Sequence, residues 1–346
     1  MKKFFIVLVI ALVALTAVVA QGSSEAATTA TEVKTYKIGV SIYQYTDNFM
    51  TLYRNEIEAY FKSLETDTVK YEIIMADGKN DMAEQTNQVN NFITQGVDAI
   101  ILNLVQTSSA DAVIDMIVAA DIPCILINRE PLAYDKDGNT LDEQYEGILN
   151  NAKVCYVGAD ARQSGSFQGR MIAELDDHGD INGDGVISYI MIEGDPENID
   201  AQYRTQYSIK YLTDAGYKVE CLDDQVGNWD QTKGQELCAN ALAKYGDKIE
   251  VVFCNNDAMA LGAAAAIQAA GRTVGKDIYL VGVDALEEAQ EMVAEGTMTG
   301  TVLNDHIGQS HAAVDVTIKA LNGEEINNYY WVDYVMVNAE YLAANK

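Results

Sequence analysis

The chain has 346 residues, of which 52 are acidic and 23 are basic, so its formal net charge at pH 7 is -29. A surface this acidic repels the phosphates of nucleic acids and of anionic lipids, which argues against nucleic-acid binding. A chain of this length also exceeds what a single hydrophobic core usually supports, and it therefore predicts two domains.

The first predicted element is a secretory signal peptide over residues 1–20. A basic start is followed by the apolar stretch from Phe4 to Leu15, and the region ends at the small residue Ala20. This order is typical of a signal that is cleaved off, not of a structural helix. We therefore expect an exported, soluble mature protein that begins with a flexible leader over residues 21–35.

From there on the sequence alternates short apolar runs with longer amphipathic ones. The helix predicted over 47–64, for example, repeats apolar residues at helical spacing behind a cap at Thr46 or Asp47. Strands and helices in near-regular alternation predict an α/β fold with parallel sheets covered by helices on both faces. We expect ten strands in two such sheets. They span residues 37–42, 71–76, 99–105, 124–127, 154–157, 187–192, 218–222, 250–254, 278–283 and 300–303.

The five cysteines do not predict a disulfide framework, because an odd number cannot all pair. Cys124, Cys155 and Cys254 lie inside apolar runs that are predicted to be strands, which favours buried free thiols. Cys221 and Cys238 are the two that could pair, and the sequence leaves that question open.

One loop carries a calcium motif. The segment DINGDGVIS places Asp180, Asn182 and Asp184 at alternate positions, with Gly185 in sixth place. In such a motif the three side chains converge on one hard cation, while the glycine permits the backbone to reverse. A helix-loop-helix calcium site would also need a glutamate at the twelfth position, which is Met191 here. The segment therefore predicts either a calcium site that is closed from elsewhere in the fold or an Asx-rich turn.

Polar side chains follow most of the predicted strands. In open α/β sheets the functional residues gather just past the carboxyl ends of the strands. Asp, Asn and Arg recur there, with Phe49 and Trp229 nearby, and this mixture suits a sugar, whose hydroxyls donate and accept while its C–H faces lie on aromatic rings. Each residue could instead simply cap the next helix. The polar residues are Asp47, Asn103, Asp195, Asn198, Asp200, Arg204, Asn255, Asn256, Asp257, Asp284, Asn304 and Asp305.

Four strings carry a resemblance to a known family: KIGVSIYQYTDNF from Lys37, NNDAMA from Asn255, GVDAL from Gly282 and TVLND from Thr301. They resemble the periplasmic galactose/glucose-binding proteins of bacterial ABC sugar transporters, and the similarity extends over nearly the whole mature chain. The resemblance implies a periplasmic binding protein of type I fold, with two Rossmann-like lobes, each a mostly parallel sheet flanked by helices, and a three-segment hinge. It also implies a monomer, not an enzyme, that delivers D-glucose or D-galactose to an ABC permease and, in some members, reports to a chemoreceptor.

The resemblance places the three crossings near Ile122, Leu303 and residues 330–333. The N-terminal lobe is accordingly expected over 36–122 plus 304–332. The C-terminal lobe, with the calcium loop, is expected over 123–303 plus 333–346.

The resemblance also assigns the sugar site. The residue types are retained except at Asn198, where the family has a histidine. Asparagine is shorter and never charged, so the contact on that side of the sugar is expected to differ. Phe49 and Trp229 match the two rings that sandwich the sugar. The matching hydrogen-bonding residues are Asp47, Asn103, Asp200, Arg204, Asn256, Asp284 and Asn304.

The same resemblance supplies a closing ligand for a structural calcium ion, namely Glu250 at the start of a predicted strand. Ser188 replaces a longer amide side chain of the family and is expected to bind directly or through water. The remaining implied ligands are the side chains of Asp180, Asn182 and Asp184 and the carbonyl of Val186.

Several alternatives compete with this interpretation. The ligand could be another monosaccharide, such as a pentose or a modified hexose. A repressor effector domain would need a basic helix-turn-helix where the signal peptide stands. A glycoside hydrolase could use two of Asp47, Asp200 and Asp284, but Arg204 is expected to keep Asp200 ionised, whereas a general acid needs a raised pKa. The acidic segment 135–139 is interpreted as a turn.

Overall fold

The structure is a computed structural model that describes residues 33–107, 110–131 and 151–345. The signal peptide, nearly all of the leader and the acidic turn at 135–139 therefore lie outside the described residues. In the described ranges, no helix combines the length and the apolar character that crossing a bilayer requires.

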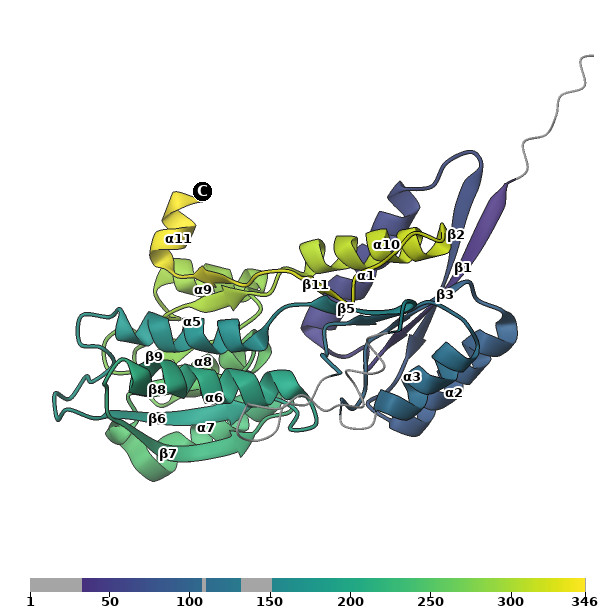
Figure 1. Ribbon diagram of the computed structural model, residues 1–346. Helices are drawn as coiled ribbons and strands as arrows, with labels where there is room; N and C mark the ends of the chain where they lie inside the picture. Colours follow the sequence, from purple (N-terminus) through teal and green to yellow (C-terminus); the bar gives the residue numbers. More distant parts are fainter. Residues whose placement is uncertain (1–32, 108–109, 132–150, 346) are drawn as a thin grey trace, which may run out of the picture. The chain divides into compact units, whose positions relative to one another are not determined.

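The first lobe is built on six parallel strands (Figure 1). Their order across the sheet is β11-β5-β4-β3-β1-β2, and each neighbouring pair is parallel. The strands are β1 (Lys34–Ile42), β2 (Val69–Asp77), β3 (Ala99–Leu102), β4 (Cys124–Ile127), β5 (Val154–Gly158) and β11 (Tyr329–Trp331).

Helices cover both faces of this sheet. Two of them share a buried core with β1, β3, β4 and β5, and the other two share a second core on the opposite face. The first pair is α1 (Asn48–Ser63) and α10 (His306–Leu321), and the second pair is α2 (Met82–Gln95) and α3 (Ala110–Ala119). The cap expected for the first helix is present, because Asp47 accepts a hydrogen bond from the Met50 amide at 2.7 Å.

The second lobe is built on a four-stranded parallel sheet, β7-β6-β8-β9, and a two-stranded antiparallel pair, β10-β12. Single parallel bridges, Val281 to Gly300 and Asp284 to Leu303, connect the two. The strands are β6 (Ile187–Glu193), β7 (Val219–Val226), β8 (Val251–Cys254), β9 (Tyr279–Val281), β10 (Thr301–Leu303) and β12 (Val335–Val337).

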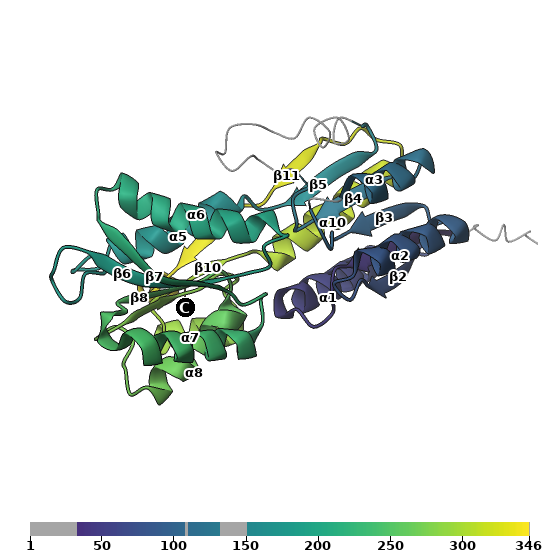
Figure 2. The ribbon, with the colours of Figure 1, turned by 90° about the horizontal axis from the view of Figure 1, so that it is seen from below.

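Helices lie on both faces of the four-stranded sheet, as Figure 2 shows. The helices α5 (Ala161–Ala173) and α6 (Ile199–Asp214) pack on one face. The other face carries α7 (Gln231–Tyr245), α8 (Asp257–Ala269) and α9 (Glu287–Glu295). A short 3-10 helix (Gly246–Lys248) follows α7, and α11 (Ala339–Ala344) ends the chain. The predicted fold class, two mostly parallel sheets flanked by helices, is therefore confirmed.

The expected position of the first crossing is wrong. β4 pairs with β3, and β5 pairs with β4, so both strands belong to the first sheet and to the first lobe. The chain enters the second lobe after Gly158, since α5 begins at Ala161. The second and third crossings lie where they were expected, between β10 and α10 and between β11 and β12. An apolar run predicts a buried strand, but it does not say which sheet the strand joins.

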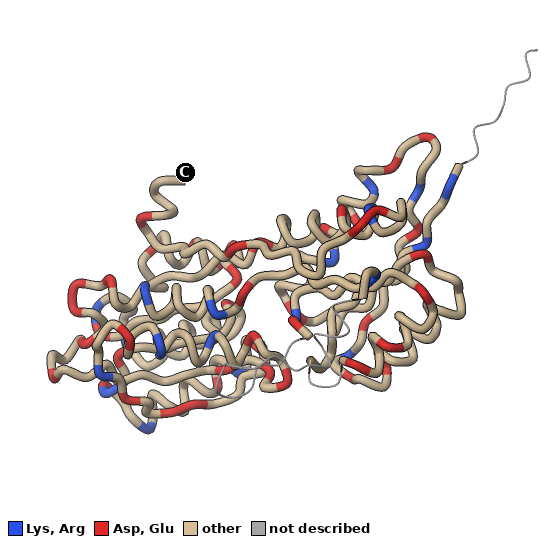
Figure 3. Tube along the Cα trace, in the orientation of Figure 1, with Lys and Arg blue, Asp and Glu red and all other residues tan. Residues whose placement is uncertain are grey.

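All ten predicted strands occur, nine of them with shifted ends, whereas β11 and β12 are not predicted from the sequence. Each of these two has three residues, too few to show a period. All five cysteines are free, and Cys221 is exposed while Cys238 is buried, so the two do not form a disulfide. Acidic residues are spread over helices and loops of both lobes rather than gathered in one patch (Figure 3).

Candidate functional site

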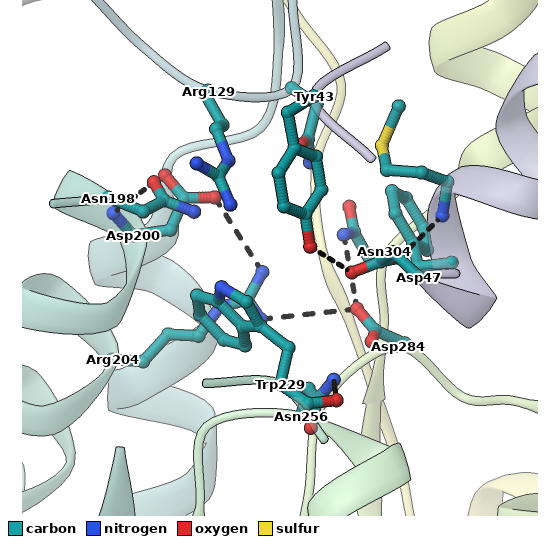
Figure 4. A pocket seen from close by; sticks show the side chains of 13 residues that line it. Tyr43, Asp47, Arg129, Asn198, Asp200, Arg204, Trp229, Asn256, Asp284 and Asn304 are labelled. Atoms are coloured by element: carbon teal, nitrogen blue, oxygen red, sulfur yellow. Dashed lines mark hydrogen bonds and ion pairs between the residues drawn. The ribbon is translucent and has the colours of Figure 1, made fainter. Parts of the chain in front are cut away.

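A small cavity lies where the carboxyl ends of strands from both lobes meet (Figure 4). Its volume is about 30 Å³, which is room for about two water molecules. A larger molecule can therefore enter only if the lining side chains separate. The lining residues are Tyr43, Asp47, Phe49, Met50, Asn128, Arg129, Asn198, Asp200, Arg204, Trp229, Asn256, Asp284 and Asn304.

The structure brings nine of the ten sugar-site residues expected from the resemblance around this one cavity. Asn103 is the exception. Its side chain is buried behind the wall, where it accepts a hydrogen bond from the Tyr43 amide at 3.2 Å and donates to Asn128 Oδ1 at 3.1 Å. Asn103 therefore positions residues that line the cavity.

Sequence reasoning missed four lining residues, namely Tyr43, Met50, Asn128 and Arg129. Asn128 and Arg129 directly follow β4, so the same strand-end rule, applied to the fourth strand, would have found them. Met50 lies in the first turn of α1, and Tyr43 directly follows β1. A methionine or a tyrosine at such a position is as typical of the core as of a binding site, so neither indicated a function.

Arg204 on α6 is the central positive charge of the cavity. It is 4% exposed, and its guanidinium donates to the Asn255 carbonyl at 2.8 Å and to the Tyr334 hydroxyl at 3.1 Å. The carboxylates of Asp200 and Asp284 lie 3.7 and 4.0 Å away (Figure 4). Burial acts to lower the pKa of Arg204, but Tyr334, Asp284 and Asp200 together raise it above the usual value. The group therefore stays charged.

The two carboxyls beside it behave differently from the expectation. Burial raises the pKa of Asp200 to about 6, although Arg204 and Arg129 act to lower it. Burial likewise raises the pKa of Asp284 well above its usual range. The expectation that Arg204 prevents a raised pKa at Asp200 is therefore wrong, because at 3.7 Å the attraction does not offset the loss of water around a carboxyl that is 3% exposed. With a pKa of about 6 the carboxyl is nevertheless mostly ionised at pH 7, as the sequence predicted.

A second guanidinium, that of Arg129, stands on the first-lobe side. It is 1% exposed and lies 3.6 Å from the centre of the Tyr43 ring. The Tyr43 hydroxyl in turn donates to Asp47 Oδ2 at 2.6 Å. Nε and Nη2 of Arg129, Nε of Arg204 and Nε1 of Trp229 have no hydrogen-bond partner among the described residues. Buried donors without partners are costly, so this cavity requires a ligand or water that offers acceptors.

Two lining residues are held in an unusual backbone conformation. Trp229 has a φ of +66° and Asp284 a φ of +122°, both in the region that favours glycine. A Cβ added at Gly194 would overlap the indole ring of Trp229, so the ring packs directly on that backbone. Strain of this kind persists where the surrounding structure fixes it, and it often marks functional sites.

The predicted calcium loop lies in the second lobe, between α5 and β6. Glu250 is 1% exposed and contacts the loop, accepting hydrogen bonds from the amides of Asn182 and Ser188, both at 2.9 Å. Asp180 accepts from the amides at 183, 184 and 185, and Asp184 accepts from the amide at 186. Gly185 has a φ of +87°, which gives the backbone reversal that the motif requires.

The carboxylates of this loop therefore face backbone amides. Throughout the described ranges, no group of three or more His, Cys, Asp or Glu side chains converges as a metal site. The donor set still has the chemistry that calcium prefers, since Asp180, Asn182, Asp184 and Glu250 all present oxygen. Burial raises the pKa of Glu250, and the nearby Asp180 and Asp184 raise it further, which shows that like charges crowd this end of the lobe.

Comparison with known proteins identifies the family. The model of the periplasmic binding protein domain matches residues 38–325. The chain is 34% identical over 292 residues to the D-galactose/methyl-galactoside binding periplasmic protein MglB of Haemophilus influenzae, a match that covers 83% of this chain and 82% of that protein. It is 26% identical over 275 residues to the ribose import binding protein RbsB of Salmonella typhimurium, with 79% and 82% covered.

A solved structure gives the same result. The ABC transporter solute binding protein from Bacillus halodurans, with bound myo-inositol, has a TM-score of 0.75 and 31% identity, and the match covers 90% of this chain and 96% of that one. The chain therefore belongs to the periplasmic binding protein domain family, and its fold is the type I fold of sugar ABC solute-binding proteins.

Proposed function

We propose that this protein captures D-galactose or D-glucose in the cavity between its lobes and delivers the sugar to the membrane subunits of an ABC importer. The lining of the cavity is the observation that carries the proposal, and the galactose-binding relative supports the choice of a hexose. Export to the periplasm after cleavage of residues 1–20 is part of the same proposal. A chemoreceptor as a second partner stays a prediction.

The donors and acceptors of the cavity suit a neutral polyhydroxy ring. Arg129 and Trp229 offer buried N–H groups without partners, while Asp200, Asp284 and Asn256 offer oxygens. A hydroxyl accepts from the first set and donates to the second, so each sugar hydroxyl can serve both. Hydrogen bonds to charged groups contribute about 1.5 to 3 kcal/mol each, which offsets the loss of water from several hydroxyls.

A cyclitol such as myo-inositol is the second candidate. The solved structure with bound myo-inositol is 31% identical to this chain. In addition, the cavity differs from the galactose/glucose pattern on one side, where Asn198 stands in place of a histidine and Arg129 supplies two further donors.

Titration calorimetry of the mature protein against D-galactose, D-glucose, myo-inositol and D-ribose tests the proposal. We expect a hexose to bind with micromolar affinity or tighter, which corresponds to about -8 kcal/mol. No heat with either hexose at millimolar concentration would contradict the hexose proposal. Heat with myo-inositol alone would select the second candidate.

Hydrolysis of galactosides is not expected, although the raised pKa of Asp200 removes one argument against it. The relatives that match this chain are solute-binding proteins, and that kinship is now the stronger argument. Release of reducing sugar on prolonged incubation with a galactoside would overturn this expectation.

Trp229 should report binding. Its ring lines the cavity, and Trp229→Ala is expected to cost about 2 kcal/mol or more of sugar affinity through lost stacking and a wetter cavity. Gly194→Ala should also weaken binding, because the added methyl displaces the ring. The matched control is Trp331→Ala, since Trp331 is 46% exposed on β11 and does not line the cavity. Equal affinities of Trp229→Ala and wild type would place the sugar elsewhere.

Sugar affinity should fall as the pH drops below about 6. Hydroxyls donate to the ionised form of Asp200, whose pKa in the free protein is raised to about 6, so binding below that pH requires loss of a proton. The dissociation constant should therefore rise up to tenfold per pH unit below 6. Calorimetry between pH 7.5 and 4.5 measures the change, and Asp200→Asn should remove the step.

The effect of Asp200 on folding stability has the opposite direction. Its pKa in the folded protein, about 6, exceeds the ordinary value of 3.8. Its protonated form therefore favours the folded state below pH 3.8, and this contribution is lost as the pH rises through 6. Weaker sugar binding at pH 5 without a fall in the melting temperature of the ligand-free protein would separate the two effects.

We further propose that the loop from Asp180 to Ser188, closed by Glu250, binds a structural calcium ion. The oxygen donors and the position of Glu250 support the proposal. Each carboxylate has lone pairs beyond those that accept from the backbone amides, and these would bind the ion.

A further inference from the structure

Among the described residues, three polar contacts link the first lobe to the turn over residues 195–198, beside the cavity. This turn follows β6 in the second lobe. From the first lobe, Arg129 Nη1 lies 3.3 Å from Asp195 Oδ2. Thr107 donates to the Glu197 carbonyl through its amide at 3.3 Å and through its hydroxyl at 2.9 Å. The turn is therefore held from the first lobe at two separate points.

Arg129 connects this turn to the ligand cavity. Its Nη1 also donates to the Val105 carbonyl at 2.6 Å, and its guanidinium stacks on Tyr43. In the part of the chain that the structure describes, Nε and Nη2 have no hydrogen-bond partner, and the side chain lines the cavity (Figure 4). One guanidinium therefore has one end fixed to the first lobe and to Asp195, while its other nitrogens are available to a ligand.

The turn itself carries cavity residues at its far end. Asp195 Oδ1 accepts a hydrogen bond from the Glu197 amide at 3.0 Å, and the Asp195 carbonyl accepts one from the Asn198 amide at 2.9 Å. The Asn198 side chain then accepts from the Asp200 amide at 3.1 Å and begins α6. Asn198 and Asp200 line the cavity, but Asp195 does not.

We propose that Asp195 is a positioning residue for sugar binding, because its carboxylate ties Arg129 across the cavity and so holds the lobes together around the ligand. The inference rests on the proposed sugar-binding function. Its physical basis is that Arg129 is a nearly inaccessible charge, and within the described ranges its ion pair is with Asp195 of the opposite lobe. Truncating one partner of such a buried pair leaves the other charge unpaired and mainly speeds dissociation of the complex.

The test measures sugar binding by Asp195→Ala, Asp195→Glu, Arg129→Ala and the double alanine variant. Asp195→Ala should raise the dissociation constant at least tenfold, mostly through a faster dissociation rate in stopped-flow tryptophan fluorescence. Asp195→Glu, which keeps the carboxylate, should recover most of the affinity. The double variant should lose less than the product of the two single losses, since both remove the same contact.

Controls separate positioning from a merely structural role. Asp214→Ala removes an exposed carboxylate that pairs with Lys210 on α6, and it should leave binding unchanged. The melting temperature of ligand-free Asp195→Ala should match that of wild type. Three results would each overturn the inference. The first is a dissociation constant of Asp195→Ala within twofold of wild type, and the second is a melting temperature of ligand-free Asp195→Ala well below that of wild type. The third is a loss of affinity in the double variant equal to the product of the two single losses.

A failure of the proposed function looks different. If wild type gives no heat with any sugar of the panel, the proposed function fails, and the contact is then judged in the ligand-free protein by hydrogen exchange. Loss of the Asp195 carboxylate should speed exchange of the Thr107 amide, which donates across the lobes to the same turn. Unchanged exchange at Thr107 would overturn the proposed tie independently of any ligand.

Discussion

Replacing Arg204 with methionine should weaken hexose binding at least a hundredfold, or about 3 kcal/mol. Arg204 is 4% exposed, it lies between Asp200 and Asp284, and its Nε has no partner among the described residues. The variant removes both the donors and the positive charge that the ligand and the two carboxyls share. Titration calorimetry at pH 7.5 measures the loss.

The fold should survive this substitution. The pKa values of Asp200 and Asp284 are already raised, mainly by burial, so without the guanidinium both carboxyls can take up protons instead of remaining as unpaired charges. Near-ultraviolet circular dichroism should therefore stay close to that of wild type. Arg170→Met is the matched control, because Arg170 lies on α5 in an exposed pair with Glu174. An affinity loss below threefold in Arg204→Met would contradict a central role.

Much of the cavity could be predicted because its residues combine two signals. Asp47, Asn198 and Asn256 each cap the helix that follows a strand, and each also lines the cavity. One residue can therefore both cap a helix and line the cavity, and the role of these residues in sugar binding stays a prediction. Parallel strands end at one edge of a sheet, so the position of a residue after a strand is enough to place it near the site.

The features that the sequence did not predict depend on the folded structure and not on the position of a residue in the chain. Asn103 follows a strand like the others, yet its side chain turns toward Tyr43 and Asn128 behind the wall. The strands β4 and β5 are expected in the second lobe from the sequence, and both pair in the first sheet. The pKa of Asp200 depends on how completely its carboxyl is buried, which the spacing to Arg204 could not show. The missing information is therefore the direction or depth of a side chain in two of these cases and the pairing partner of a strand in the other.

Removal of calcium should lower the melting temperature by several degrees and leave hexose affinity within a few fold. The proposed site lies in the loop between α5 and β6, and none of Asp180, Asp184 and Glu250 lines the sugar cavity. An ion that binds only the folded state adds about 2.7 kcal/mol of stability at a hundred times its dissociation constant. Scanning calorimetry with and without a chelator measures this shift.

Variants of the loop make the prediction specific to these residues. Asp184→Ala and Glu250→Gln should melt lower than wild type and should no longer respond to chelator, because the ion has lost a charged ligand. Part of the fall in melting temperature of Glu250→Gln comes from weaker hydrogen bonds with the loop amides that donate to this carboxylate. The response to chelator is therefore the decisive measurement. Glu236→Gln, an exposed change on α7, should keep the full response.

If chelator leaves the melting temperature of wild type unchanged, the loop is an Asx-rich turn whose carboxylates only accept hydrogen bonds from the backbone. If chelator abolishes sugar binding in protein that stays folded, the ion belongs to the ligand site instead.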